Sequence, residues 1–237
     1  MDMEKEFKKY VSKFDLNNDS ISKKYYHSLR VMNKARKIAE SIELSEEYIN
    51  IATTVGLLHD YGRFEQWKRY HTYADGKSVD HGDLGVEILF DEKEIEKYDI
   101  KKENYKIIYN AIKYHNKLEI PENLTKEEKI ICKIIRDADK LDIYELVLDG
   151  KILFIDDNNP INPEVRKKFF ENSSINKKIV KNESNGILLR LALVYDINFN
   201  WSIEYIKNNH IIDRMLEMIE NKKKYEEYFS YIKKYLG

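Results

Sequence analysis

The sequence predicts an all-α fold, and two observations support this. Its 237 residues include only 8 glycines and 3 prolines, which leaves few of the turn signals that separate strands. Apolar residues recur at spacings of three and four along most of the chain, as they do in amphipathic helices. A chain of this length can bury one substantial core. We therefore expect a single helical domain over 1–237, with a main bundle at about 20–150 and additional C-terminal helices at about 160–237.

Two helices are expected in the first quarter of the chain. The first, at about 23–41, has an apolar face that also carries His27, four residues before Val31. The second, at about 46–58, runs into the string His59-Asp60-Tyr61-Gly62, where the glycine and the loss of period indicate a helix end. Both His59 and Asp60 are thus expected at the C-terminal end of this helix.

The next segment, 63–80, breaks the apolar period and contains a glycine beside Asp75, which predicts a loop. Loops of this length in compact domains are often functional. Asp80 has the character of an N-cap, with Asp83 three residues later. A helix is therefore expected from Asp80 to about Phe90, with His81 in its first turn.

Two further helices carry the remaining candidate residues. One, at about 104–116, ends on Tyr114-His115, and the other covers about 126–148. Asp139 lies four residues after Ile135 on the second, and therefore on its apolar face. Since an ionised carboxylate away from water needs a cation or several hydrogen-bond donors, Asp139 is expected to have a charged partner.

Turn-forming residues at 156–160 and at Pro163 indicate an internal boundary beyond the candidate residues. Downstream, the segment 186–195 is strongly apolar and 201–219 has the period of an amphipathic helix. The lysine-rich end from Lys222 is expected to form an exposed surface helix.

Composition excludes several classes of protein. Because 41 Lys and Arg balance 42 Asp and Glu, the chain has no bulk positive field, and nucleic acid is not an expected partner. The single cysteine, Cys132, allows neither a disulfide framework nor a thiolate cluster and is expected in the core. The charged N-terminus and the lack of a long apolar run predict a cytoplasmic protein without membrane association, either a monomer or a homo-oligomer.

Six residues form a candidate metal site. A single histidine on an apolar face is more often a hydrogen-bonded core residue than a ligand, but here several occur with buried acids. Imidazole and carboxylate together suit divalent Mn, Fe, Ni, Co or Zn, and a helical bundle can bring distant residues to one point. The candidates are His27, His59, Asp60, His81, His115 and Asp139.

The order of these residues resembles the H...HD...D signature of the HD superfamily, whose members include many metal-dependent phosphohydrolases. The signature is carried by His27, by His59-Asp60, and by Asp139 within Asp137-Ala138-Asp139-Lys140-Leu141-Asp142. The surrounding string 56–63, Gly-Leu-Leu-His-Asp-Tyr-Gly-Arg, is similar to the family's pattern around its His-Asp pair. This resemblance covers about 20–150 and implies an HD-domain helical bundle.

The resemblance also implies a ligand set. His27, His59, Asp60 and Asp139 match the ligands of a first metal ion, and His81 and His115 match the extra ligands of the two-metal subfamilies, where Asp60 bridges the ions. Two cations about 4 Å apart can generate hydroxide and stabilise an in-line displacement at phosphorus. The expected activity is hydrolysis, as a phosphatase or phosphodiesterase, of a nucleotide or other small phosphoester by a metal-activated water.

Two cationic residues are candidates for contact with the substrate phosphate, and with Asp60 they complete the expected catalytic set. Arg63 follows the His-Asp pair, and its forked guanidinium suits a phosphate, although a salt bridge within the loop explains it equally well. Lys140 adjoins Asp139 and resembles the lysine that family members place near phosphate.

Two alternatives remain open on the ligands alone. Some HD-fold proteins use the same ligand set to hold two irons as oxygenases, and others are metal-containing sensors that bind a nucleotide. Membership in one subfamily is not expected. The sequence around His115 lacks the Gly-Tyr-Pro motif of the HD-GYP cyclic-dinucleotide phosphodiesterases. A ppGpp synthetase domain and the arginine-rich signatures of deoxynucleotide triphosphohydrolases are not evident either.

Overall fold

The computed structural model describes residues 3–237, and within that range every regular element is a helix or a helical turn. The all-α prediction is therefore confirmed. The chain divides into two compact units, one ending at Asp139 and one beginning at Lys140. Their boundary lies inside a long helix, whereas the turn residues at 156–160 form a loop. That the whole chain behaves as one domain stays a prediction, and each unit is described separately below.

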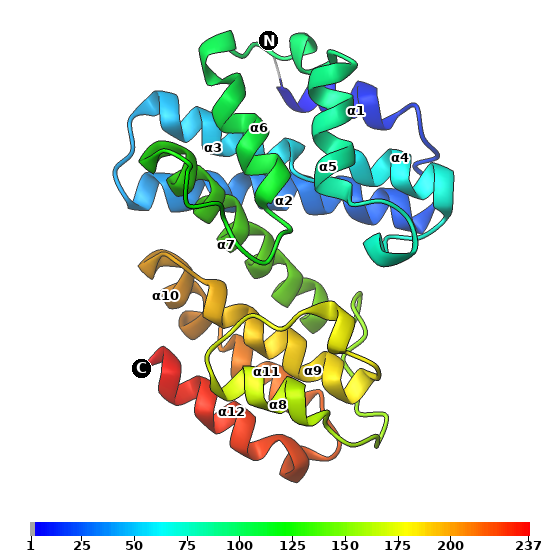
Figure 1. Ribbon diagram of the computed structural model, residues 1–237, viewed down its shortest axis with the longest axis vertical. Coiled ribbons are helices and arrows are strands. Elements are labelled where there is room, and N and C mark those ends of the chain that lie inside the picture. Colours follow the sequence, from blue (N-terminus) through cyan, green and yellow to red (C-terminus); the bar gives the residue numbers. More distant parts are fainter. Residues whose placement is uncertain (1–2) are drawn as a thin grey trace. The chain divides into compact units, whose positions relative to one another are not determined.

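The N-terminal unit, coloured blue to green in Figure 1, is a bundle of helices joined by short turns. Four single turns, at Asp75–Lys77, Glu87–Asp91, Glu94–Lys97 and Lys102–Asn104, interrupt the connections before and after α5. The helices are α1 (Met3–Val11), α2 (Asp19–Ser41), α3 (Glu46–Leu58), α4 (Tyr61–Tyr70), α5 (His81–Val86), α6 (Tyr105–Tyr114) and α7 (Lys126–Leu148), the last continuing into the second unit.

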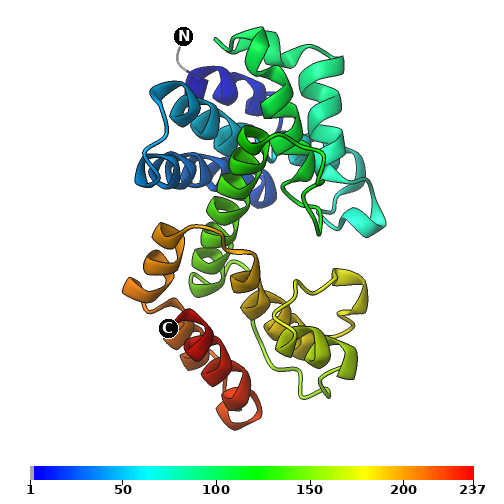
Figure 2. The ribbon, with the colours of Figure 1, turned by 60° about the vertical axis from the view of Figure 1, so that its left-hand side comes forward.

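The bundle is organised around α2 and α3, which run side by side in both views (Figures 1 and 2). Asn18 caps α2, since its side chain accepts hydrogen bonds from the backbone of the first turn. The apolar faces predicted for both helices are buried, including Val31 and Ile38 on α2 and Val55 on α3. Burying each such side chain contributes roughly 1.5 to 3 kcal/mol to the free energy of folding, relative to leaving it exposed. Packing rather than intrinsic helix propensity therefore holds these helices in place.

The predicted loop at 63–80 is partly wrong, because α4 occupies its first half. The apolar period is missing there because the buried face of α4 is itself polar: Arg63 and Gln66 are buried beside Phe64. The helix ends at His71, whose φ of 49° is left-handed. The loop predicted from the sequence therefore begins only at His71, ten residues of helix after Asp60.

Two glycines allow the helices of this unit to approach one another closely. A Cβ at Gly62, on α4, would lie 2.5 Å from the carbonyl oxygen of His81, at the start of α5. A Cβ at Gly82 would lie 3.1 Å from the carbonyl oxygen of Ile112, near the end of α6. The absence of a side chain at these two positions lets the N-terminus of α5 lie against both neighbours, which brings His81 toward Asp60 and the end of α6.

The C-terminal unit, coloured yellow to red in Figure 1, has its own apolar core. Asn162 and Asn182 cap its first two complete helices, and Pro163 stands in the first turn of α8, where its missing N–H costs nothing. Its helices are the end of α7, then α8 (Pro163–Phe170), α9 (Glu183–Leu191), α10 (Asn200–Asn208), α11 (Ile211–Glu217) and α12 (Lys222–Leu236).

Two expectations for this unit need correction. The single helix predicted at 201–219 is two helices, because the chain reverses at His210, which has a left-handed φ of 51°. The lysine-rich end from Lys222 is helical but not simply exposed, since α12 buries Tyr225, Tyr228, Phe229 and Ile232. The apolar face of this helix was not recognised in the sequence because lysines lie between its apolar residues along the chain.

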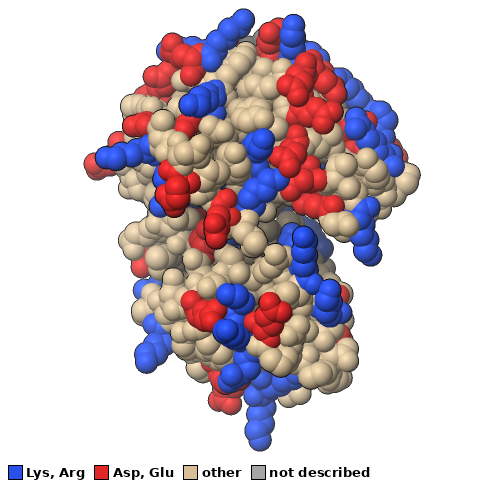
Figure 3. Space-filling model, in the orientation of Figure 1, with Lys and Arg blue, Asp and Glu red and all other residues tan. Residues whose placement is uncertain are grey.

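Charge is distributed evenly over each unit on the face seen in Figure 3, where acidic and basic side chains are interspersed. Within the described residues, no helix combines the length and apolar character that crossing a membrane requires.

Candidate metal centre

Four predicted ligands of the first ion come from α2, from the junction of α3 with α4, and from α7 in the N-terminal unit. His27 lies in the middle of α2, and Asp139 lies on α7. His59 ends α3 and Asp60 begins α4 without an intervening loop, so the chain turns between them and both side chains enter one space. His27, His59 and Asp60 are buried, whereas 20% of the Asp139 side chain is exposed.

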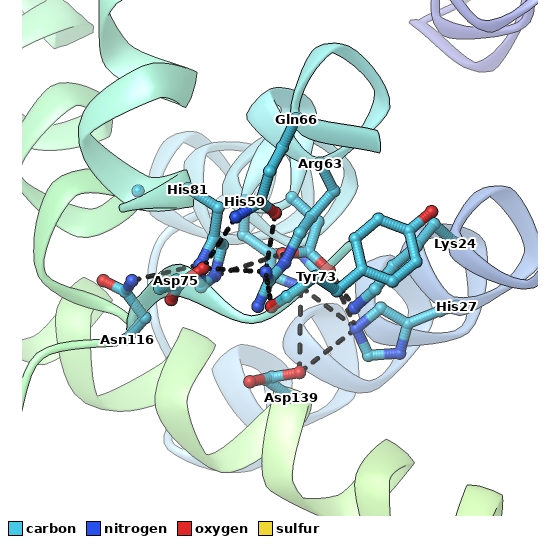
Figure 4. A network of polar contacts seen from close by, with 12 residues as sticks. Lys24, His27, His59, Arg63, Gln66, Tyr73, Asp75, His81, Asn116 and Asp139 are labelled. Atoms are coloured by element: carbon cyan, nitrogen blue, oxygen red, sulfur yellow. Dashed lines mark hydrogen bonds and ion pairs between the residues drawn. The ribbon is translucent and has the colours of Figure 1, made fainter. Parts of the chain in front are cut away.

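His27, His59 and Asp139 each place a donor atom within 4.8 Å of the others (Figure 4), and His59, Asp60 and His115 do the same. His27 Nε2 lies 3.2 Å from His59 Nε2 and 3.1 Å from Asp139 Oδ1. Asp60 Oδ2 lies 3.4 Å from His27 Nε2 and 3.5 Å from His59 Nε2. The structure therefore brings together two imidazole nitrogens and two carboxylate oxygens.

A second group forms on the other side of the same aspartate. His81, at the first position of α5, and His115, just after α6, place their Nε2 atoms 3.0 Å apart. Asp60 Oδ1 lies 3.4 Å from the first of these nitrogens and 3.8 Å from the second. Each oxygen of Asp60 thus faces a different pair of histidines, as a bridging carboxylate requires.

Backbone carbonyls orient two of the imidazoles. Nδ1 of His59 lies 2.8 Å from the carbonyl oxygen of Gly56, and Nδ1 of His115 lies 2.6 Å from that of Ile112. A carbonyl oxygen only accepts, so Nδ1 must carry the proton and donate it. In a neutral imidazole the remaining nitrogen, Nε2, then presents a lone pair, which is the form that binds a metal.

His81 is oriented in the same way by a carboxylate. Its Nδ1 lies 2.8 Å from Asp75 Oδ2 and donates to it, so its Nε2 also presents a lone pair. The Nε2 atoms of His81 and His115 therefore face each other at 3.0 Å with no proton between them. Two lone pairs at that distance repel unless a cation lies against both, and this is the electrostatic environment of a metal site.

Burial keeps these imidazoles neutral. Desolvation, followed by the charge of Arg63, lowers the pKa of His81 to about 4. Desolvation also lowers the pKa of His59, and it lowers that of His115 together with the neighbouring His81. All three nitrogens are therefore free of protons at neutral pH, as metal binding requires.

The two carboxylates remain ionised for the opposite reason. Burial alone would raise the pKa of Asp60, but the ammonium of Lys24, the imidazole of His59 and the guanidinium of Arg63 hold it well below its usual value. Burial would raise the pKa of Asp139 as well, but a hydrogen bond from His27 and the charges nearby lower it. Both side chains are thus available as anionic ligands.

The donor set and its spacing fit divalent transition ions. Ligands bound at about 2.0 to 2.2 Å around one ion lie roughly 3 Å from each other, and the distances between facing donor atoms here run from 3.0 to 3.8 Å. Nitrogen and oxygen donors without a thiolate suit Mn, Fe, Co, Ni or Zn.

Arg63 and Lys140, the predicted phosphate contacts, already have partners. Arg63 donates to Asp75 Oδ1 at 2.9 Å and to the carbonyl oxygen of Tyr73 at 2.7 Å, and its Nε lies 3.5 Å from Asp60 Oδ1. Lys140 forms an ion pair of 2.6 Å with Asp196 within the C-terminal unit. Arg63 therefore lies beside the bridging carboxylate, whereas the structure joins Lys140 to a different acid.

Sequence reasoning missed two charged residues at the centre. Lys24 Nζ lies 2.6 Å from Asp60 Oδ2, and Asp75 orients His81. Lys24 could have been found, since it stands one helical turn before His27 on the same face. Asp75 carried no such signal, because nothing in the sequence relates a loop residue to a histidine at the start of the next helix.

With this geometry in view, the chain can be compared with known proteins. A family model described as HD domain matches residues 25–144, half of the chain. The chain belongs to the HD-domain family. The matched range contains every ligand candidate, from His27 to Asp139. Neither the comparison with curated proteins nor that with solved structures gives a match. HD domains are generally metal-dependent hydrolases that bind divalent ions, and the His and Asp cluster is compatible with this.

Proposed function

We propose that the protein is a binuclear metal-dependent phosphohydrolase that cleaves a nucleotide or another small phosphoester. The observation that carries this proposal is the position of Asp60, whose two carboxylate oxygens each face a separate pair of histidines. A single-ion site would use one of these oxygens and leave the lone pairs of His81 and His115 opposed. A two-ion centre uses both oxygens and both pairs.

When bound, two divalent cations supply a nucleophile at neutral pH and stabilise the attacking and leaving oxygens of a displacement at phosphorus. The protein residues supply the geometry for this chemistry. The Nδ1 hydrogen bonds of His59, His81 and His115 aim their Nε2 atoms at one space, so little reorganisation accompanies binding. Asp60 holds the two ligand groups together.

The side chains at the centre differ in their exposure to solvent. The histidine side chains there are at most 4% exposed, whereas Asp139 is 20% exposed and Lys24 is 22% exposed. Water and a phosphate group are therefore expected to approach past Lys24 and Asp139. This direction favours Lys24 as the cation that contacts the substrate phosphate.

The three candidate cations consequently have different proposed roles. Lys24 would contact the phosphate, because it combines exposure with contact to Asp60. Arg63 is only 9% exposed and would hold Asp60 in position while adding positive charge beside it. Lys140 would contact a phosphate only after breaking its ion pair with Asp196. Of the three cations, it therefore has the least support for a role in catalysis.

Metal analysis with the variant His115→Ala tests the two-ion centre. The wild-type chain should bind two ions of Mn, Ni, Co, Fe or Zn, while H115A should bind one and lose phosphatase and phosphodiesterase turnover with its helical circular dichroism unchanged. His71→Ala is a matched control, because His71 is exposed at the end of α4 outside the ligand set. Unchanged ion stoichiometry in H115A would remove His115 from the centre.

Substrate assays under nitrogen distinguish the proposed hydrolase from its two alternatives. A hydrolase should release phosphate or a phosphomonoester from a substrate panel without oxygen, using added Mn, Ni or Co. An oxygenase should consume oxygen only with iron bound. A sensor should bind a nucleotide tightly without forming product, and either of the latter two results would contradict the proposed activity.

A further inference from the structure

Asp75 lies outside the metal ligands of the proposed function, yet its carboxylate makes the shorter of two contacts with His81 Nδ1, which Asn116 Nδ2 also approaches at 3.2 Å. Asp75 begins the single turn Asp75–Lys77 in the connection between α4 and α5. Its Oδ2 accepts a hydrogen bond from His81 Nδ1–H at 2.8 Å. The other two oriented imidazoles, at His59 and His115, use carbonyls of their own helices for this purpose. Unlike these two, His81 is oriented by a charged side chain from a loop.

The other oxygen of Asp75 is held firmly. Oδ1 accepts hydrogen bonds from Arg63 at 2.9 Å and from Gln66 at 3.0 Å, both on α4. Gln66 is fully buried, and its amide also donates to Ser78 Oγ and to the carbonyl oxygen of Val79. The loop is thereby tied to α4 on both sides of Asp75, and the carboxylate cannot turn away from His81 without breaking these bonds.

The Arg63 contact links this arrangement to the bridging carboxylate. Arg63 donates to Asp75 and also lies 3.5 Å from Asp60 Oδ1, the oxygen that faces His81. Asp75, Arg63, Asp60 and His81 therefore form a closed ring of contacts around the second group of candidate ligands. Such a ring fixes the angle at which His81 Nε2 meets an ion.

We propose that Asp75 is a positioning residue for the second metal ion, which holds His81 as the Nδ1–H tautomer with Nε2 directed at Asp60 Oδ1. A carboxylate behind an imidazole ligand fixes its ring and its tautomer and increases its basicity. Without Asp75, His81 can protonate Nε2 instead, which blocks the ligand, or rotate away. This inference rests on the two-ion centre of the proposed function but not on the substrate.

Metal titration of Asp75→Ala tests this inference. The first ion should bind as in the wild type, while affinity for the second should fall by about 10- to 100-fold, the usual effect of losing such a partner. Asp75→Asn can still accept from Nδ1–H through its amide oxygen, so it should lose less affinity than the alanine variant. Asp83→Asn is the control, since Asp83 also lies in the first turn of α5 but pairs with Lys117.

The tautomer gives a readout that needs no turnover. Long-range ¹H–¹⁵N spectra of the metal-free protein should show the proton of His81 on Nδ1 in the wild type and in Asp75→Asn, and a mixture of tautomers in Asp75→Ala. If Asp75→Ala does not fold, Asp75→Asn is used instead. Its affinity for the second ion should be lower than that of the wild type.

Two results would overturn the inference in distinguishable ways. Wild-type second-ion affinity and an unchanged His81 tautomer in Asp75→Ala would reject the role of Asp75 and leave the two-ion centre standing. A wild-type protein that takes up only one ion would reject the two-ion centre and the role of Asp75 together.

Discussion

At the scale of single residues, the Lys24 ammonium is expected to compete with a metal ion for the carboxylate of Asp60. The ammonium lies 2.6 Å from Asp60 Oδ2, an oxygen that the first metal ion would also use. Lys24 Nζ also lies 5.6 Å from the ring of Tyr73, whose hydroxyl donates to the carbonyl of Ser20. Binding of a metal ion should displace the ammonium toward solvent, where a substrate phosphate would meet it.

Lys24→Met should therefore strengthen metal binding and weaken substrate binding. Removing the competing ammonium should tighten the first ion by about tenfold, or about 1.4 kcal/mol, while KM for an active phosphoester should rise with a smaller change in kcat. Metal titration and steady-state kinetics measure the two effects. Lys23→Met is the control, since Lys23 is exposed and pairs only weakly with Asp19. Unchanged metal affinity in K24M would show that the ammonium does not compete.

Sequence reasoning found side chains that the structure brings close together and missed several that surround them. His27, His59, Asp60 and Asp139 could be proposed as ligands because helical period placed them on inward faces or at helix ends, where an acid or imidazole is unusual. His81 and His115 were grouped with them as further histidines at helix ends, and the family resemblance added their assignment to a second ion. Asp75 could not be predicted, because its role depends on a loop conformation fixed by Gln66, which looks like an ordinary surface residue in the sequence.

At the scale of elements, α4 illustrates the limit of hydropathy as a guide. Its period was invisible because it buries Arg63 and Gln66, and these residues are buried because they support the candidate centre. The same limit hid the stripe of aromatic residues on α12 among lysines. Segments that build a polar site are thus the ones where an apolar pattern is least informative.

Gly62→Ala should disturb the contact between α4 and α5 and, with it, the second group of ligands. The added methyl would lie 2.5 Å from the backbone of His81, so the helices must separate. We expect a loss of about 1 to 3 kcal/mol in the free energy of unfolding, with weaker binding of the second ion than of the first. Denaturant melts and metal titration measure these changes.

Gly76→Ala is the matched control for this substitution, because a Cβ at Gly76 meets nothing within 4 Å. The control should keep wild-type stability and both ions. If Gly62→Ala behaved like the control, the close approach of the two helices would not be what positions His81.

At the scale of the whole molecule, all six candidate ligands lie in the unit that ends at Asp139. Metal binding is therefore expected to stabilise that unit by mass action, by about 2.7 kcal/mol at 100 times Kd. Hydrogen exchange with and without Mn should show slower exchange for amides up to Asp139 and unchanged exchange in the C-terminal unit. Equal protection of both units would contradict this and would support the prediction of a single cooperative domain over 1–237.

The helix α7 crosses the boundary between the units without a break. Before the boundary it contributes Ile131, Ile135 and Ala138 to one core, and after it Tyr144 and Val147 to the other. Since each residue turns a helix by about 100°, inserting one residue between Ile135 and Asp139 would turn the Asp139 carboxylate away from His27, while Ile131 and Ile135 kept their places in the core. The spacing along this part of α7 is therefore constrained by apolar packing and by a candidate ligand at once.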